Sequence, residues 1–364
     1  MKIKEITQYL ENIAPLAYQE AYDNSGLIVG DENKDVSSVL ITLDCTEDVV
    51  DEAINNNCNL IISHHPIIFN GLKQIIGNNY VERTIIKAIK NSITIYSIHT
   101  NLDNVSNGVS AKIAKIIGLD ECSVLAPKRN LLRHLVVYCP YSDAENIRSA
   151  LFDAGAGKIG NYDKCSFSSK GNGTYRANKE CNPYAGKIGE LHNENEERIE
   201  VIFPIHKERD VINSLKNNHP YEEVAYQIYV LDNLYKKVGA GIIGVLPDEV
   251  GIHEFLDIVK IKMKTDCIRY TNLVNKKIKK VAICGGSGSF LISDAISAGA
   301  DIFITSDVKY HDFFDADNDI IIADIGHYES EQFTKELIYE LLSKKFSKFA
   351  IQLSKINTNP INYL

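Results

Sequence analysis

The sequence has no pair of cysteines spaced as CxxC, although it contains eight cysteines in 364 residues. This absence excludes zinc ribbons and thioredoxin-like redox motifs. The chain also lacks an uncharged apolar run of about 18 residues, so we expect no transmembrane helix. Its first segment, MKIKEITQYLENIAP, is amphipathic and lacks the apolar core of a signal peptide. We therefore expect a cytoplasmic protein with reduced cysteines that act as small core residues.

Positive charge is in deficit, with 39 Lys and Arg against 48 Asp and Glu and a net charge of −9. This balance offers no overall attraction for a nucleic acid backbone or an anionic membrane, so we expect neither partner. Charged residues make up 24% and hydrophobic residues 45%, which excludes disordered and collagen-like chains. The length corresponds to about two and a half domains.

Short apolar runs alternate with helical patterns in two parts of the chain, which predicts a parallel α/β fold. The two parts are related by a shift of 242 residues, the difference between positions 39 and 281. The shift aligns two strands and the helix between them, which indicates an internal duplication. The aligned pairs are 39–41 with 281–283, 53–54 with 295–296, and 60–63 with 302–305.

The middle of the chain has the predicted order β-α-β-β-α-β, which is typical of a ferredoxin-like module. We therefore expect residues 1–129 and 235–364 to be two similar halves of one split α/β domain around a shared crevice. Residues 130–234 would form an inserted α+β domain of about 100 residues. Within it, the motif HPYEE at 219–223 is either a turn before an edge strand or an effector-binding element.

Three sets of His and acidic residues follow predicted strands. His64 and His65 follow LIIS, Asp103 lies in HTNLD, and His327 and Glu331 lie in GHYESE. Each set alone has a structural alternative: a solvated loop, a helix cap, or an acidic helix start. Together they lie at the carboxyl ends of parallel strands, where this architecture places its sites.

Five ligands without a cysteine suit Zn²⁺, Mn²⁺ or Fe²⁺ and exceed what one catalytic zinc needs. We therefore expect two divalent ions about 3.5–4 Å apart. His311 either contacts a metal ligand from outside the site or acts as a proton shuttle. The alternative is an exposed helix histidine without a role in the site. The loop Gly285–Gly288 is either a phosphate cradle or a tight turn between strand and helix.

These motifs resemble the GTP cyclohydrolase 1 type 2 homologues, also called the Nif-three-like family. The resemblance rests on SHHPIIF, HTNLD, SDVKYHD, GHYESE and YDNSGLIVG, where we would expect Trp at the position of Tyr22. The inserted segments GAGKIGNYDKCSF and HPYEEVAYQIY resemble the PII-like or CutA-like middle domain of a longer branch. The resemblance covers nearly the whole chain.

The resemblance implies a dinuclear metal site inside a ring-shaped homohexamer. It assigns His64, His65, Asp103, His327 and Glu331 as metal ligands, with Glu331 as the bridge. We therefore expect a metal-dependent hydrolase that acts on a nucleotide or another phosphorylated small molecule, with His311 or Glu331 moving protons. The alternative is a metal-binding regulatory or scaffold ring without turnover, in which the inserted domain senses an effector.

Overall fold

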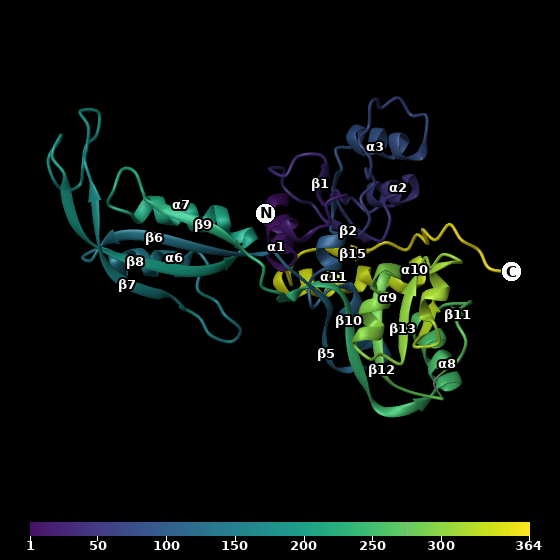
Figure 1. The fold of residues 1–364 in the computed structure, drawn as a ribbon. Coiled ribbons are helices and arrows are strands. Elements are labelled where there is room, and N and C mark those ends of the chain that lie inside the picture. Colours follow the sequence, from purple (N-terminus) through teal and green to yellow (C-terminus); the bar gives the residue numbers. More distant parts are fainter. Residues whose placement is uncertain (275) are drawn as a thin grey trace. The chain divides into compact units, whose positions relative to one another are not determined.

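The computed structural model describes residues 1–274 and 276–364 (Figure 1). The chain forms two compact units, one from Met1–Pro127 with Lys236–Leu364 and one from Lys128–Tyr235. These boundaries lie next to the expected ones at 129 and 235. Within the described residues, no helix combines the length and the apolar character needed to cross a bilayer.

The first sheet of the larger unit has the strand order β1-β4-β3-β2-β15. All neighbours in it are parallel except β1 and β4, which are antiparallel. Its strands are β1 (Gly26–Val29), β2 (Val39–Thr42), β3 (Leu60–Ser63), β4 (Thr94–Ser97) and β15 (Ile351–Leu353). The helices of this half are α1 (Ile3–Ile13), α2 (Glu47–Asn55), α3 (Tyr80–Lys90), α4 (Thr100–Asp103) and α5 (Val109–Ile117).

The second sheet has the order β11-β14-β13-β12-β10-β5. Its central strands β12, β13 and β14 are parallel, and β10 and β11 join them antiparallel. The strands are β5 (Asp120–Lys128), β10 (Tyr235–Gly251), β11 (Arg269–Tyr270), β12 (Lys277–Ser287), β13 (Ile302–Ser306) and β14 (Ile321–Asp324). The helices are α8 (Ile252–Met263), α9 (Ile292–Ser297), α10 (His327–Glu331) and α11 (Thr334–Lys345).

The strand registers agree with the predicted duplication. Val39 pairs with Leu60 in the first sheet, and Val281 pairs with Ile302 in the second, which is the same pairing shifted by 242 residues. The next two pairs along each ladder follow the same shift. A shift of one residue between paired strands would turn their buried apolar side chains to the other face of the sheet. The buried side chains therefore fix the strand pairing, and the two halves share it.

One apolar core is common to both sheets. Ile41 and Ile62 from the first sheet join Ile283 and Ile304 from the second in a single cluster. The opposite faces of the sheets carry their own clusters, so the central strands are buried on both sides. This double burial explains why these strands read as continuous apolar runs rather than alternating ones. Each fully buried isoleucine contributes about 1.5–3 kcal/mol to stability.

The cysteines are only in part the core residues that we expected. Four of them are buried, but Cys122 and Cys267 are exposed. Cys122 lies near the start of β5, where the residues are exposed to solvent. Cys267 lies in the segment that leads into β11.

The smaller unit contains a four-stranded antiparallel sheet in the order β7-β8-β6-β9. Two helices, α6 and α7, pack a shared core against it. The elements are β6 (Leu132–Pro140), α6 (Ala144–Asp153), β7 (Phe167–Tyr175), β8 (His192–Pro204), α7 (Glu208–Asn218) and β9 (Tyr226–Leu231). This is the β-α-β-β-α-β order of a ferredoxin-like fold. A closer relation to PII or CutA stays a prediction.

Candidate metal centre

Three strand ends of the larger unit deliver the five predicted ligands to one place. His64 and His65 directly follow β3, and Asp103 ends the short helix α4 after β4. Helix α10 begins at His327, three residues after the end of β14. Two helices follow β14, α10 and α11, and they are separated at Gln332 and Phe333. Because α10 already starts at His327, its first turn brings His327 and Glu331 to the same side.

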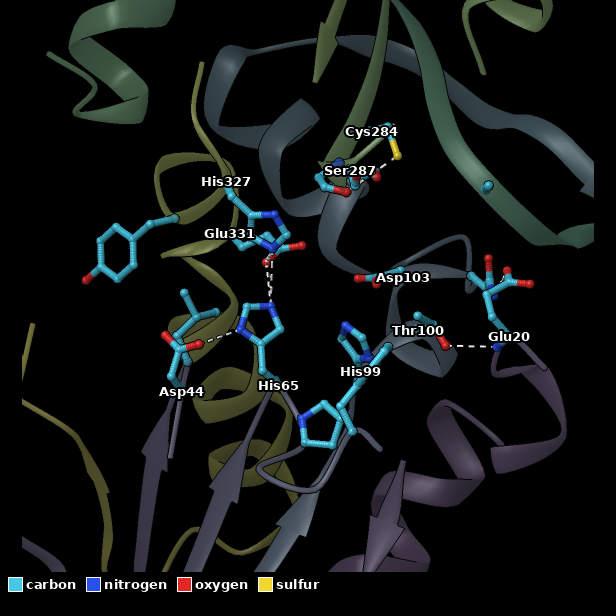
Figure 2. A pocket seen from close by; sticks show the side chains of 18 of the residues that line it. Glu20, Asp44, His65, His99, Thr100, Asp103, Cys284, Ser287, His327 and Glu331 are labelled. Carbon is cyan, nitrogen blue, oxygen red and sulfur yellow. Dashed lines mark hydrogen bonds and ion pairs between the residues drawn. The ribbon is translucent and has the colours of Figure 1, made fainter. Parts of the chain in front are cut away.

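One carboxylate oxygen of Glu331 lies between two imidazole rings (Figure 2). Its Oε2 atom is 2.9 Å from Nε2 of His65 and 3.0 Å from Nε2 of His327. The two Nε2 atoms are 3.4 Å apart. These three atoms form the first group of potential metal ligands.

The other carboxylate oxygen of Glu331 faces a second group of potential metal ligands. Its Oε1 atom is 3.8 Å from Nε2 of His64, which is itself 3.5 Å from Oδ1 of Asp103. Nε2 of His64 and Oδ1 of Asp103 are sealed from solvent, and neither has a hydrogen-bond partner among the described residues. Burying polar atoms without partners costs free energy, and a cation between them would satisfy both. Glu331 therefore belongs to two groups of potential ligands, and the residues of each group fit a divalent cation.

A hydrogen-bond acceptor orients each predicted ligand histidine through its Nδ1 atom. His64 Nδ1 lies 2.7 Å from the carbonyl oxygen of Ile98, and His65 Nδ1 lies 2.7 Å from Oδ1 of Asp44. His327 Nδ1 lies 2.6 Å from Oδ2 of Asp307. An acceptor at Nδ1 fixes the tautomer that leaves the Nε2 lone pair for a metal, as in most protein metal sites.

His99 has the same arrangement and was not predicted as a functional residue. Its Nδ1 atom is 2.7 Å from Oδ1 of Asp23, and its ring points toward the cluster (Figure 2). A ligand atom of His99 lies within 4.8 Å of those of His64 and His65. Because Nδ1 is engaged by Asp23, the other ring nitrogen of His99 is left for the pocket. This histidine is therefore a candidate for holding or moving a proton.

Opposing charges perturb the protonation of these groups strongly. Burial opposes the charged form of His65 and His327, but Glu331 and the paired aspartates outweigh it and raise the pKa of His65 to about 10 and that of His327 to about 11. Burial and the charge of Glu331 raise the pKa of Asp103 to about 8. Burial also disfavours the charge on Glu331, but His327 and His65 hold its pKa well below the usual range.

We expect metal binding at pH 7 to release about three protons per chain, since His65, His327 and Asp103 must lose theirs to become ligands. The apparent affinity should then rise with pH until about 11, the pKa of His327. Calorimetric titration of the metal-free chain with Mn²⁺ in buffers of different ionisation enthalpy measures the number of protons. Binding without proton release would contradict this account of the site.

The structure does not bring His311 into the cluster. It is exposed, and its ring contacts Tyr310 and Phe314. Strand β13 ends at Ser306, and Asp307 then adopts a left-handed φ of 55°, which turns the chain before His311 is reached. The residue that reaches the ligands from this segment is therefore Asp307, and a role of His311 in proton transfer stays a prediction.

The glycine segment 285–288, which begins within the end of β12, packs closely against its neighbours. The amides of Gly285 and Gly286 donate to the hydroxyls of Ser110 and Ser330, at 3.2 and 2.9 Å, so neither is left for a phosphate. A Cβ atom at Gly286 would lie 2.3 Å from Oε1 of Glu331. The first three residues of the segment therefore continue β12, and Gly286 leaves room for the carboxylate of Glu331. A phosphate cradle or a tight turn at this segment stays a prediction.

A cavity of about 500 Å³ opens onto the cluster (Figure 2). Its walls include the exposed aromatic rings of Tyr22 and Phe69, whose centroids are 6.1 Å apart. The C-terminal segment adds Asn359, Pro360 and Ile361. The described residues that line the cavity include acidic side chains and histidines but neither Lys nor Arg.

Comparisons with known proteins cover the whole chain. It is 39% identical to the "GTP cyclohydrolase 1 type 2 homolog" of Bacillus subtilis (strain 168), over 99% of this chain and 98% of that protein. It is 37% identical to the protein of the same name from Staphylococcus epidermidis RP62A, over the full length of both.

Among solved structures, a Bacillus cereus protein related to NIF3 matches with a TM-score of 0.84 and 39% identity, covering 100% of this chain and 99% of that one. The family model described as Duf34/NIF3 (NGG1p interacting factor 3) matches residues 1–360. The match extends over both halves of the larger unit and over the inserted unit. The chain therefore belongs to the Duf34/NIF3 family.

Proposed function

We propose that the protein is a dinuclear metal-dependent hydrolase that acts on a nucleotide or another phosphorylated small molecule. The observation that carries this proposal is the position of Glu331, whose two carboxylate oxygens face two separate ligand groups. The names of the relatives, which include "GTP cyclohydrolase 1 type 2 homolog", point to the same class of chemistry.

Two bound ions of Zn, Fe or Mn would supply Lewis acidity and activate water near neutral pH. The residues of the chain hold and surround them. His64, His65, Asp103, His327 and Glu331 are the ligands, and His99 with Asp23 is placed to accept or return a proton at the pocket. Glu331 acts as a ligand here, and its lowered pKa makes it a poor base.

The cavity lining favours a substrate with a planar ring and a phosphate close to the ions. Tyr22 and Phe69 offer faces for a ring, and aromatic stacking of a base contributes about 1–3 kcal/mol. Because the described lining has no Lys or Arg, a phosphate would depend on the ions for opposite charge. We propose a homohexamer as the assembly, as the resemblance implies.

We expect nucleotide binding and turnover to require the ions. The metal-free chain should bind GMP at least about tenfold more weakly than the loaded chain. Without the ions, only the protonated His65 and His327 would offset the negative charges of Asp44 and Glu331 near the phosphate. Asp103→Asn should keep the fold and lose hydrolysis of a nucleotide panel. Equal turnover by the metal-free chain, measured on the same preparation, would refute the proposed hydrolase and favour a scaffold role.

A further inference from the structure

A second cavity, of about 360 Å³, lies entirely within the smaller unit. On β8 the residues Ile199 and Val201 face the core under the helices, so the alternate residue Glu196 faces the other side of the sheet. The cavity lies on that other side, where Glu196 from β8 and Tyr175 from β7 both line it. The volume is in the range of small-molecule sites, about 300–1,000 Å³.

Three tyrosine rings form much of its wall. The ring centroid of Tyr221 is 6.0 Å from that of Tyr175 and 5.9 Å from that of Tyr184. The rings are inclined at 61° and 51° to one another, so they present faces in different directions. A group of inclined aromatic faces around one space is the arrangement that proteins use to bind organic cations.

The motif at 219–223 builds this wall. His219 is buried, its Nε2 atom lies 2.9 Å from the carbonyl oxygen of Tyr138, and its Nδ1 atom accepts the amide of Tyr221 at 3.1 Å. Both ring nitrogens are therefore engaged, and His219 is a positioning residue for Tyr221. Glu222 accepts the amide of Asn182 at 3.0 Å, which holds the 176–185 segment beside the cavity.

The cavity carries an excess of negative charge. Glu196, Glu222 and Glu223 line it together with a single arginine, Arg176. The hydroxyl of Tyr221 donates to Oε1 of Glu196 at 3.0 Å. Burial and the nearby Glu196 raise the pKa of Tyr221 well above its usual range. A Cβ atom at Gly173 would lie 2.1 Å from Oε2 of Glu196, so the glycine leaves room for this carboxylate.

We propose that this pocket binds a small organic cation, an ammonium group that carries alkyl substituents. Aromatic faces attract such a cation through their quadrupoles, and the carboxylates complement its charge. An anion would face repulsion from Glu196, Glu222 and Glu223. A bare metal ion would not use the tyrosine faces, since hard cations prefer oxygen ligands. The proposal does not depend on the hydrolase activity of the larger unit.

Choline and its uncharged isostere 3,3-dimethylbutan-1-ol test the charge requirement on the full-length, metal-loaded chain. Calorimetry or ligand-observed NMR should find choline bound at least about tenfold more tightly than the isostere. Tyr221→Ala and Glu196→Gln should each weaken choline binding about tenfold. The matched control Tyr229→Ala changes an exposed tyrosine of the same unit that does not line the pocket, and it should bind choline normally.

Equal binding of choline and the isostere, or no choline binding at all, would overturn the proposal. Tyr221→Phe keeps the ring and removes only the bond to Glu196, so it should bind choline within a few-fold of the unmodified chain even if Tyr221→Ala fails to fold. A larger loss in a folded Tyr221→Phe chain would count against the aromatic contact. Glu331→Gln should retain choline binding, which separates failure here from failure of the proposed hydrolase.

Discussion

Replacing Glu331 with Gln is expected to abolish stable binding of both metal ions. The carboxylate faces both ligand groups, with its Oε2 atom near His65 and His327 and its Oε1 atom near His64. An amide keeps the shape but has one weak oxygen ligand and no charge. Residues that only hydrogen-bond to a metal ligand already contribute about 10- to 100-fold in metal affinity. Replacing a ligand itself should therefore weaken metal binding by at least about a hundredfold.

Elemental analysis after dialysis and calorimetric titration with Mn²⁺ measure this effect. Glu329→Gln is the matched control, because Glu329 is also buried on α10 but accepts a hydrogen bond from Asn359 at 3.0 Å. The control should keep both ions. If the Glu331→Gln chain binds two ions as tightly as the control does, the Glu331 carboxylate does not bridge the two ions.

Gly286→Ala should have nearly as large an effect on the metal site without changing any ligand. The new Cβ atom would lie 2.3 Å from Oε1 of Glu331, a separation that forces the carboxylate to move. Displacing it removes the shared ligand from both groups. We expect at least about a tenfold loss of metal affinity, measured by the same titration.

The chain offers a control for the backbone cost of this substitution. Gly299 has a φ of +69°, against +66° at Gly286, and a Cβ atom there would meet nothing within 4 Å. A left-handed alanine costs about 1–2 kcal/mol, so both variants should melt at lower temperature. Only Gly286→Ala should lose metal. Equal metal content in the two variants would show that the close contact with Glu331 has no effect.

The ligands could be predicted from the sequence because each is tied to a local pattern. A buried strand ends, and a His or acidic residue follows within a few positions, as at His64 and Asp103. Parallel strands then bring these ends to one edge whatever the details of the loops. The internal duplication could also be predicted from local patterns, since the buried strands of both halves keep the same spacing. The strand registers preserve the 242-residue shift.

The residues that orient the ligands could not be predicted in this way. Asp44 is 21 residues from His65, Asp23 is 76 from His99, and Asp307 is 20 from His327. These pairs depend on how loops meet in space, and an aspartate in a loop is as often a turn residue. One signal was available, because the 242-residue shift places Asp307 at the position of His65. The histidine predicted from this segment, His311, lies outside the cluster.

The most direct test of the account is the number and spacing of metal ions in the loaded protein. Elemental analysis should give about two divalent ions per chain, and anomalous diffraction should place them about 3.5–4 Å apart, with one carboxylate oxygen of Glu331 on each. A single ion held by His65, His327 and Glu331, with His64 and Asp103 left without a cation, would contradict the dinuclear centre.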